Sequence, residues 1–401
     1  DANTTGHRNV AVGAYSMGAN EGGERNTACG YNSLKTNTEG DYNVAVGEMA
    51  AAGNTTGHYN VAVGAYAFEK NTTGGWNTAV GQAALQENTT AHYNTAVGRS
   101  SMEKNTTGSA NTALGYHSMY SNTEAGNCTA VGYRALYTNT TGGNNTALGH
   151  DAMLLNQTGF QNVALGRNAL YTCVSGDSNT AVGYNAALTV TGDGNTAVGH
   201  TTMSEATTGS WNTAYGERSL KDNTSGAQNV AIGSSAMLNN EGGDYNTGVG
   251  REVLQANVSG DNNVAVGYKA MYSNTSGQCT AIGYAALYNN TTAINNVAVG
   301  LNCLYNNTTG YENVAVGRSA LQEVDDGYRN TATGHYAGFN LQGGDSNAAF
   351  GAYSLYCNGV QDCEDNTGLG YAAGYGLTSG NQNTFVGRSA GDTTTTGSNN
   401  S

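Results

Sequence analysis

One pattern of apolar and polar residues recurs along the chain every 17 positions. In segments such as 60–76, 77–93 and 94–110 it reads N-[TV]-A-V-G-x-x-[AS]-[LM]-x-x-N-T-T-G-x-x, and we number these positions 1 to 17. Twenty-three copies start between Asn9 and Asn383, and 19 of the 22 intervals between starts are 17 residues; the others are 16, 16 and 19. A fixed period indicates a repeat architecture in which each copy is one structural unit.

The alternation within a copy predicts its elements. Positions 2 to 4 alternate as in a β-strand, which places positions 2 and 4 on one face and position 3 on the other. Position 4 is apolar in every copy except at Thr333, so we expect it to face the core with the Leu or Met of position 9. Position 3 is Ala in 20 of 23 copies, which indicates a face suited to close packing against another backbone or subunit. A second short strand is expected at positions 8 and 9, as at 84–85, 118–119 and 236–237.

Two composition features support a stacked sheet. Gly occupies position 5 in every copy, which predicts a backbone with φ > 0 or a corner without room for a Cβ. Pro is absent from all 401 residues, as expected where each strand N–H bonds to an adjacent coil. A disordered chain would not keep a fixed period with a fixed apolar position. We therefore predict an all-β parallel β-solenoid of 23 coils over residues 9–391, with an N-terminal remnant (1–8) and a polar C-terminal tail (392–401).

Charge and composition exclude several classes of protein. Only 11% of residues are charged and the net charge is −14, which argues against a cationic groove for nucleic acid. Collagen needs Pro, and coiled coils need many more charged and helix-forming residues. No run of 18 apolar residues occurs, so we expect no membrane segment in this chain.

The core string N-V-A-V-G-x-x-A, as in residues 60–67, resembles the head repeat of trimeric autotransporter adhesins, the YadA-like heads. Similar repeats are also seen in some phage tail fibres. The resemblance implies a left-handed parallel β-roll, assembly of three chains and a role in adhesion, although the 17-residue coil is longer than that of the family. The sequence contains no neck or coiled-coil stalk, so we expect either a fragment or a fibre that uses the coil without an anchor.

The closing turn creates a series of N-x-[ST] motifs. If the producing cell glycosylates this motif, glycans would line one edge of the solenoid; alternatively, Asn-Thr-Thr-Gly is simply a good turn. The candidate acceptors are Asn54, Asn71, Asn88, Asn105, Asn139, Asn156, Asn223, Asn257, Asn274, Asn290 and Asn307.

Tyrosines recur at positions 6 and 10. Two aromatic columns could bind sugar rings or a partner, or each ring could pack on the ring one coil away. Of the seven cysteines, Cys357 and Cys363 bracket a short loop in the 19-residue copy. We predict a disulfide between them, which suits an extracellular location, with two free thiols as the alternative.

The sequence shows no catalytic constellation. The seven histidines lie singly, outside any metal-binding motif. The acidic clusters Glu323-Asp325-Asp326 and Asp362-Glu364-Asp365 have the oxygen ligands that Ca²⁺ prefers, but we favour the interpretation that they are simply acidic loops. We expect no cofactor and no metal.

We therefore expect a non-enzymatic extracellular fibre or adhesin head that binds surfaces or glycans multivalently. It would form a homo-oligomer, with a trimer favoured, or an end-to-end fibre. The partners would be glycans or a host or matrix surface. The alternatives are an ice-binding solenoid and a phage or virus tail-fibre shaft.

Overall fold

The structure is a computed structural model that describes residues 3–205, 207–357, 363–393 and 395–401. The chain divides into two compact units, residues 1–197 and 198–401, and each is described by itself. The prediction of a single repeat domain over 9–391 stays a prediction.

The described residues form 23 strands of three residues each, and every strand occupies positions 2 to 4 of a copy. Unit 1 holds β1 (Val10–Val12), β2 (Thr27–Cys29), β3 (Val44–Val46), β4 (Val61–Val63), β5 (Thr78–Val80), β6 (Thr95–Val97), β7 (Thr112–Leu114), β8 (Thr129–Val131), β9 (Thr146–Leu148), β10 (Val163–Leu165) and β11 (Thr180–Val182). Strand β12 (Thr196–Val198) falls at the division. Unit 2 holds β13 (Thr213–Tyr215), β14 (Val230–Ile232), β15 (Thr247–Val249), β16 (Val264–Val266), β17 (Thr280–Ile282), β18 (Val297–Val299), β19 (Val314–Val316), β20 (Thr331–Thr333), β21 (Ala348–Phe350), β22 (Thr367–Leu369) and β23 (Thr384–Val386).

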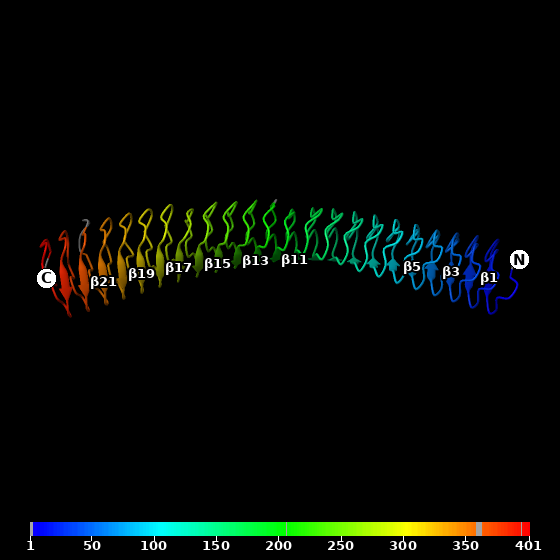
Figure 1. Cartoon of the computed structure of the whole chain (residues 1–401), viewed down its shortest axis with the longest axis horizontal. Helices are drawn as coiled ribbons and strands as arrows, with labels where there is room; N and C mark the ends of the chain where they lie inside the picture. The colour runs from blue at the N-terminus through cyan, green and yellow to red at the C-terminus, as the bar shows by residue number, and fades with distance from the viewer. Residues whose placement is uncertain (1–2, 206, 358–362, 394) are drawn as a thin grey trace. The chain divides into compact units, whose positions relative to one another are not determined.

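Within each unit, every strand pairs in parallel with the strand of the next coil. The register aligns equal positions, as where Ala62 of β4 lies opposite Ala79 of β5. The 16-residue interval before β17 and the 19-residue interval before β22 leave this register unchanged, because their length differences fall outside the strands. Successive coils follow one another in chain order (Figure 1). The chain is therefore a parallel β-solenoid, and the predicted fold class is confirmed.

The Gly of position 5 is required by the backbone, as predicted. Its φ lies between +120° and +145° in all 23 copies. At Gly81, where φ is +134°, an added Cβ would lie 2.5 Å from the carbonyl oxygen of Gly98 in the next coil. Both the conformation and the close approach of the next coil exclude a side chain here.

The predicted second strand at positions 8 and 9 is wrong. Residues 84–85, 118–119 and 236–237 lie in a turn, and the position 9 residue has φ near +50°, as at Leu85. Hydrogen bonds still join the coils there: the N–H of Ala83 donates to the preceding coil at Ala65, and that of Leu85 to the following coil at Ser101. The left-handed residues at positions 7 and 9 thus direct their N–H groups to opposite neighbouring coils, while the N–H of Ala84 between them bonds to Gly81 of its own coil. The coils therefore bond here without an extended backbone.

The strand faces are the reverse of those predicted. Ala96 is fully buried inside its own coil, and the residue at position 3 is buried in every strand from β2 to β23, whereas Val97 at position 4 is partly exposed. The interior is narrow: at Gly248, which replaces the Ala, an added Cβ would lie 3.0 Å from Cε of Met237 and 3.1 Å from Cγ1 of Val253. Only a residue as small as Ala fits opposite the buried Leu or Met, so the Val points outward.

Two ladders of buried asparagines complete the interior. At position 12, Nδ2 of Asn71 donates to Oδ1 of Asn54 in the preceding coil (2.7 Å) and to the carbonyl of Gly74 (3.0 Å). At position 1, the backbone N–H of Asn77 donates to Oδ1 of Asn60 (3.0 Å) and its Nδ2 to the carbonyl of Ala91 (2.9 Å). These bonds satisfy buried polar groups that would otherwise be costly.

Two ends of the position 12 ladder have no amide donor in the following coil. Oδ1 of Asn156 and Oδ1 of Asn307 are buried and have no hydrogen-bond partner among the described residues. The following coil carries Cys173 in the first case and Val324 in the second, so no amide nitrogen is present to donate. Each end of the ladder therefore leaves one acceptor unsatisfied.

Candidate binding surfaces

The outward face of the strands carries the same chemistry in every coil. Positions 2 and 4 are Thr, Val, Leu, Ile, Ala, Cys, Tyr or Phe, and no strand contains a charged residue. Many of these side chains are well exposed: Leu114 is 47% exposed, Leu165 42%, Ile232 40% and Val386 64%. The −14 net charge therefore resides elsewhere on the coils, and each unit presents an uncharged strip of β-branched and aliphatic side chains.

The N-x-[ST] asparagines belong to the buried position 12 ladder. All eleven are at most 1% exposed, and each Nδ2 donates at least one hydrogen bond, as at Asn88 to Oδ1 of Asn71. A glycan would replace one hydrogen of Nδ2, and these buried side chains leave no room for a sugar beside that atom. The glycan hypothesis conflicts with this folded geometry, and the turn interpretation accounts for the motif.

The tyrosine columns are stacks of rings. At position 10, Tyr272, Tyr288 and Tyr305 stack with centroids 5.1 and 5.0 Å apart, and their planes differ by 3° and 8°. At position 6, Tyr116 and Tyr133 stack at 5.5 Å. Each of these rings packs on the ring one coil away, as one of the two interpretations predicted. The faces inside a stack are covered, so a sugar could reach only the face of a ring at which a stack ends.

Sequence reasoning missed a third column at position 17. Tyr42, Tyr59, Trp76 and Tyr93 stack in four successive coils of unit 1, with centroids 4.8 to 5.6 Å apart. The guanidinium of Arg25, at the same position one coil earlier, lies 4.9 Å from the centre of the Tyr42 ring. Aligning the copies at position 17 would have shown this column, because aromatic residues occupy it four times in a row.

In unit 2, aromatic columns end beside one another. At position 10, Phe339, Tyr356 and Tyr375 stack at 5.0 and 5.1 Å, and the next coil has Asp392 in their place. Burial is the main cause that raises the pKa of the Tyr356 hydroxyl, and the neighbouring tyrosines add to it. Because Asp392 takes the place of an aromatic residue in the next coil, the face of Tyr375 toward that coil has no aromatic ring on it.

At position 7, Tyr336 stacks on Tyr353 at 5.7 Å, and the two following coils have Ala372 and Ser389. Tyr371, at position 6, stands at 72° to Tyr353 with a centroid distance of 6.0 Å.

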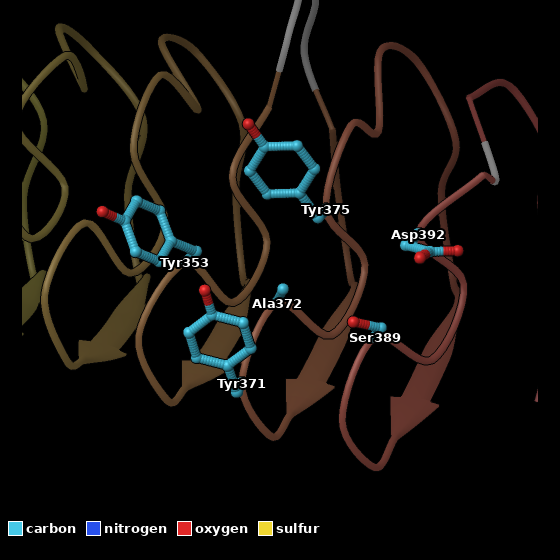
Figure 2. A pocket seen from close by; sticks show the side chains of 6 residues that line it. All are labelled: Tyr353, Tyr371, Ala372, Tyr375, Ser389 and Asp392. Atoms are coloured by element: carbon cyan, nitrogen blue, oxygen red, sulfur yellow. The ribbon is translucent and has the colours of Figure 1, made fainter.

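These column ends surround a hollow of about 350 Å³. It is lined by Tyr353, Tyr371, Ala372, Tyr375, Ser389 and Asp392. Figure 2 shows the three tyrosines around Ala372, with Ser389 and Asp392 on the side of the next coil. The guanidinium of Arg388 lies 5.7 Å from the centre of the Tyr371 ring. Asp392 is exposed and forms no ion pair among the residues that the structure describes. The hollow thus combines aromatic surface with an available carboxylate.

Cys357 and Cys363 lie close together, as the predicted disulfide requires. Both are buried, and their Sγ atoms are 3.8 Å apart as two thiols. The contact with Cys363 and burial raise the pKa of the Cys357 thiol. The pair is correctly placed for oxidation, and the disulfide stays a prediction.

The other cysteines substitute for residues of the repeat. Cys128 and Cys279 occupy position 1 and donate to the carbonyls of Gly142 and Ala293, both at 3.4 Å, where Asn would use its amide. Burial raises the pKa of the Cys303 thiol at position 8 to about 12. Cys29, on the outward strand face, is exposed.

The described residues contain no group of three or more His, Cys, Asp or Glu side chains that could hold a metal ion. In the first acidic cluster, Glu323 accepts a hydrogen bond from Asn306 and Asp325 accepts one from Thr308. In the second cluster, Asp362 lies outside the described residues. Coil-to-coil hydrogen bonding therefore accounts for the carboxylates of Glu323 and Asp325.

No family model matches the chain, and no curated protein matches it. None of the described residues belong to a helix that could span a membrane. The fold defines the class of the protein as a parallel β-solenoid, and function has to be argued from the surfaces described above.

Proposed function

We propose that the chain is a non-enzymatic structural or adhesive segment of an extracellular fibre or adhesin head, which binds surfaces or glycans multivalently. The observation that carries this proposal is the outward strand face, which repeats one uncharged chemistry coil after coil. Repeated weak contacts on a common scaffold gain strength by multivalency without any single strong site. The likeness of the core string to adhesin heads supports the same function.

The strand face is also the surface through which copies of the chain associate. We take a trimer as the favoured assembly. The Ala of position 3 is inside the coil, so the outward residues of positions 2 and 4 replace it as the contact surface. Contiguous apolar surface larger than a few hundred Å² is uncommon on monomers and marks interaction sites. In a trimer with cyclic symmetry, the same face of each chain surrounds the threefold axis.

Sedimentation equilibrium tests the assembly. The native chain is expected to sediment as a trimer, and a Val97→Lys, Val131→Lys double variant as a monomer, because charges would be buried at the contact. The control is Thr107→Lys, which places the same charge in an exposed turn and should leave the trimer intact. A native chain that is monomeric at every concentration tested would overturn the proposed contact.

Adhesion is tested with immobilised glycans and matrix proteins. The native assembly is expected to be retained on at least one coated surface, and the monomeric double variant to be released much faster, because it has lost multivalent contact. Release of products from a polysaccharide incubated with the chain would overturn the non-enzymatic part of the proposal.

One observation favours ice binding as a second candidate. Strands β5 to β9 carry Thr at position 2 in five consecutive coils, and Thr95, Thr112, Thr129 and Thr146 are exposed. The face therefore offers a regular column of hydroxyl and methyl groups on a sheet, and not only in turns. Thermal hysteresis that disappears in a Thr112→Lys variant would establish this function, and its absence in the native chain would exclude it.

A further inference from the structure

The hollow in unit 2 lies where two aromatic columns end. In the column of Phe339, Tyr356 and Tyr375, rings follow one another at about 5 Å. Asp392 is too small to cover the next face of Tyr375, and Ala372 leaves the next face of Tyr353 uncovered in the same way. A flat six-membered ring that enters the hollow would continue one of these stacks.

Polar groups surround the edge of that space. Asp392, Ser389 and Tyr371, each of which ends in a polar group, belong to the lining. A purely aromatic ligand would desolvate the carboxylate without giving it a hydrogen bond, which is costly. A ring with C–H groups on its face and hydroxyl groups on its edge satisfies both the tyrosine faces and the acceptors.

We propose that this hollow is a saccharide-binding site that takes a neutral pyranose. The sugar ring stacks on Tyr375 or Tyr353, and adjacent hydroxyls donate to Asp392. The volume of about 350 Å³ lies within the range of about 300–1,000 Å³ of small-ligand sites. The inference rests on the proposed adhesive function, for which it names a ligand class and a place.

A substitution that fills the hollow gives the sharpest test. In Ala372→Tyr, the new ring would extend the stack of Tyr336 and Tyr353. Position 7 already accepts Tyr at the same left-handed backbone, with φ of 52° at Ala372 and 59° at Tyr353. The control is Ala83→Tyr, the same change at the same position in unit 1, where it follows Tyr66 in the preceding coil.

Binding is measured by saturation-transfer NMR and calorimetry with methyl glycosides of glucose, galactose and mannose, and with choline as a cationic probe. At least one glycoside is expected to bind the native chain with a Kd on the order of 1 mM. Ala372→Tyr and Asp392→Asn should each weaken it more than tenfold, whereas Ala83→Tyr should not change it. Circular dichroism checks that each variant keeps its fold.

Three outcomes would overturn the site: no glycoside binds, Ala372→Tyr binds as well as the native chain, or choline binds in the hollow while the sugars do not. The site and the adhesive function fail separately. Sugar binding by a native chain that is not retained on any surface would refute adhesion alone. Retention of a native chain that binds no glycoside would refute the site alone.

Discussion

Buried asparagine side chains hold successive coils together at two positions of the repeat. Both asparagines are visible in the sequence, but the sequence does not distinguish an Asn that forms a turn from an Asn that forms a buried ladder. The difference is burial: Asn88 is 0% exposed, while Thr90, two residues later in the same N-x-[ST] motif, is exposed. Whether an Asn side chain lies inside the coil therefore decides its role, and the repeat pattern alone does not show which side chains lie inside.

A matched pair of variants separates the ladder from a glycan. Asn88→Ala is expected to destabilise the chain by about 1–3 kcal/mol, because Oδ1 of Asn71 loses its donor in a buried place. Thr90→Ala destroys the same N-x-[ST] motif and should change stability by less than about 0.5 kcal/mol. Urea unfolding followed by circular dichroism measures both. Equal effects of the two changes would contradict the ladder.

The buried Cys303 thiol makes stability fall at alkaline pH. Its pKa is raised from 9.0 to about 12 by burial, so between these values the unfolded chain loses a proton that the folded chain keeps. Between about pH 9 and about pH 12, this thiol alone should lower the free energy of unfolding by about 1.4 kcal/mol per pH unit, in addition to the contributions of the other buried thiols.

Cys303→Ala supplies the control, since Ala is the usual residue of position 8, as at Ala286 and Ala320 in the adjacent coils. This variant should show a smaller decrease in the urea midpoint between about pH 8 and about pH 11. An identical pH dependence in the native chain and the variant would disprove the role of the thiol.

At the scale of the element, the strand was predicted at its correct place with its faces reversed. Because Val is more hydrophobic than Ala, the sequence pattern predicts that Val97 faces the interior and Ala96 faces outward. The structure does the opposite, because the buried Leu or Met of position 9 already fills the narrow interior. Sequence patterns report which residues are apolar, but not how much space a coil encloses.

Two substitutions in β6 test this orientation. Ala96→Val should destabilise by about 1–3 kcal/mol, because it overfills a packed interior. Val97→Ala should cost less than about 1 kcal/mol in the monomer, because its side chain is partly exposed. Urea unfolding at concentrations where the chain is monomeric compares them, and a larger loss at Val97 would reverse the assignment.

At the scale of the whole molecule, the period and the Gly of position 5 were sufficient to predict a parallel β-solenoid. The hollow in unit 2 could not be predicted in the same way. It depends on Tyr353, Tyr371 and Tyr375, which lie at three different positions of the repeat, and on small residues that follow them. Only the coil geometry shows that these columns end beside one another.

Because each coil contacts its neighbours through equivalent positions, whole coils should be removable. Deleting residues 77–93 removes one period and is expected to leave a folded chain, with Asn105 taking Asn71 as its ladder acceptor. Deleting residues 77–90 removes only part of a period and leaves residues 91–93 as extra residues in the closing turn before Asn94, so this turn should be destabilised and cleaved more readily, while the strands on either side keep their register. Circular dichroism and limited proteolysis distinguish the two. Similar behaviour of both deletions would contradict the modular packing.

The position 12 ladder also has a direction. Nδ2 donates toward the preceding coil from Asn37 through Asn156, so all the amide dipoles in that run point the same way. Turning one amide over would place nitrogen against nitrogen on one side and oxygen against oxygen on the other. A single amide therefore cannot reverse at low cost. Reversing the whole run is also costly, because each Nδ2 donates to a carbonyl of its own coil as well, as Asn71 does to Gly74. The aligned amide dipoles of this row add up, and the unsatisfied Oδ1 of Asn156 lies at the negative end.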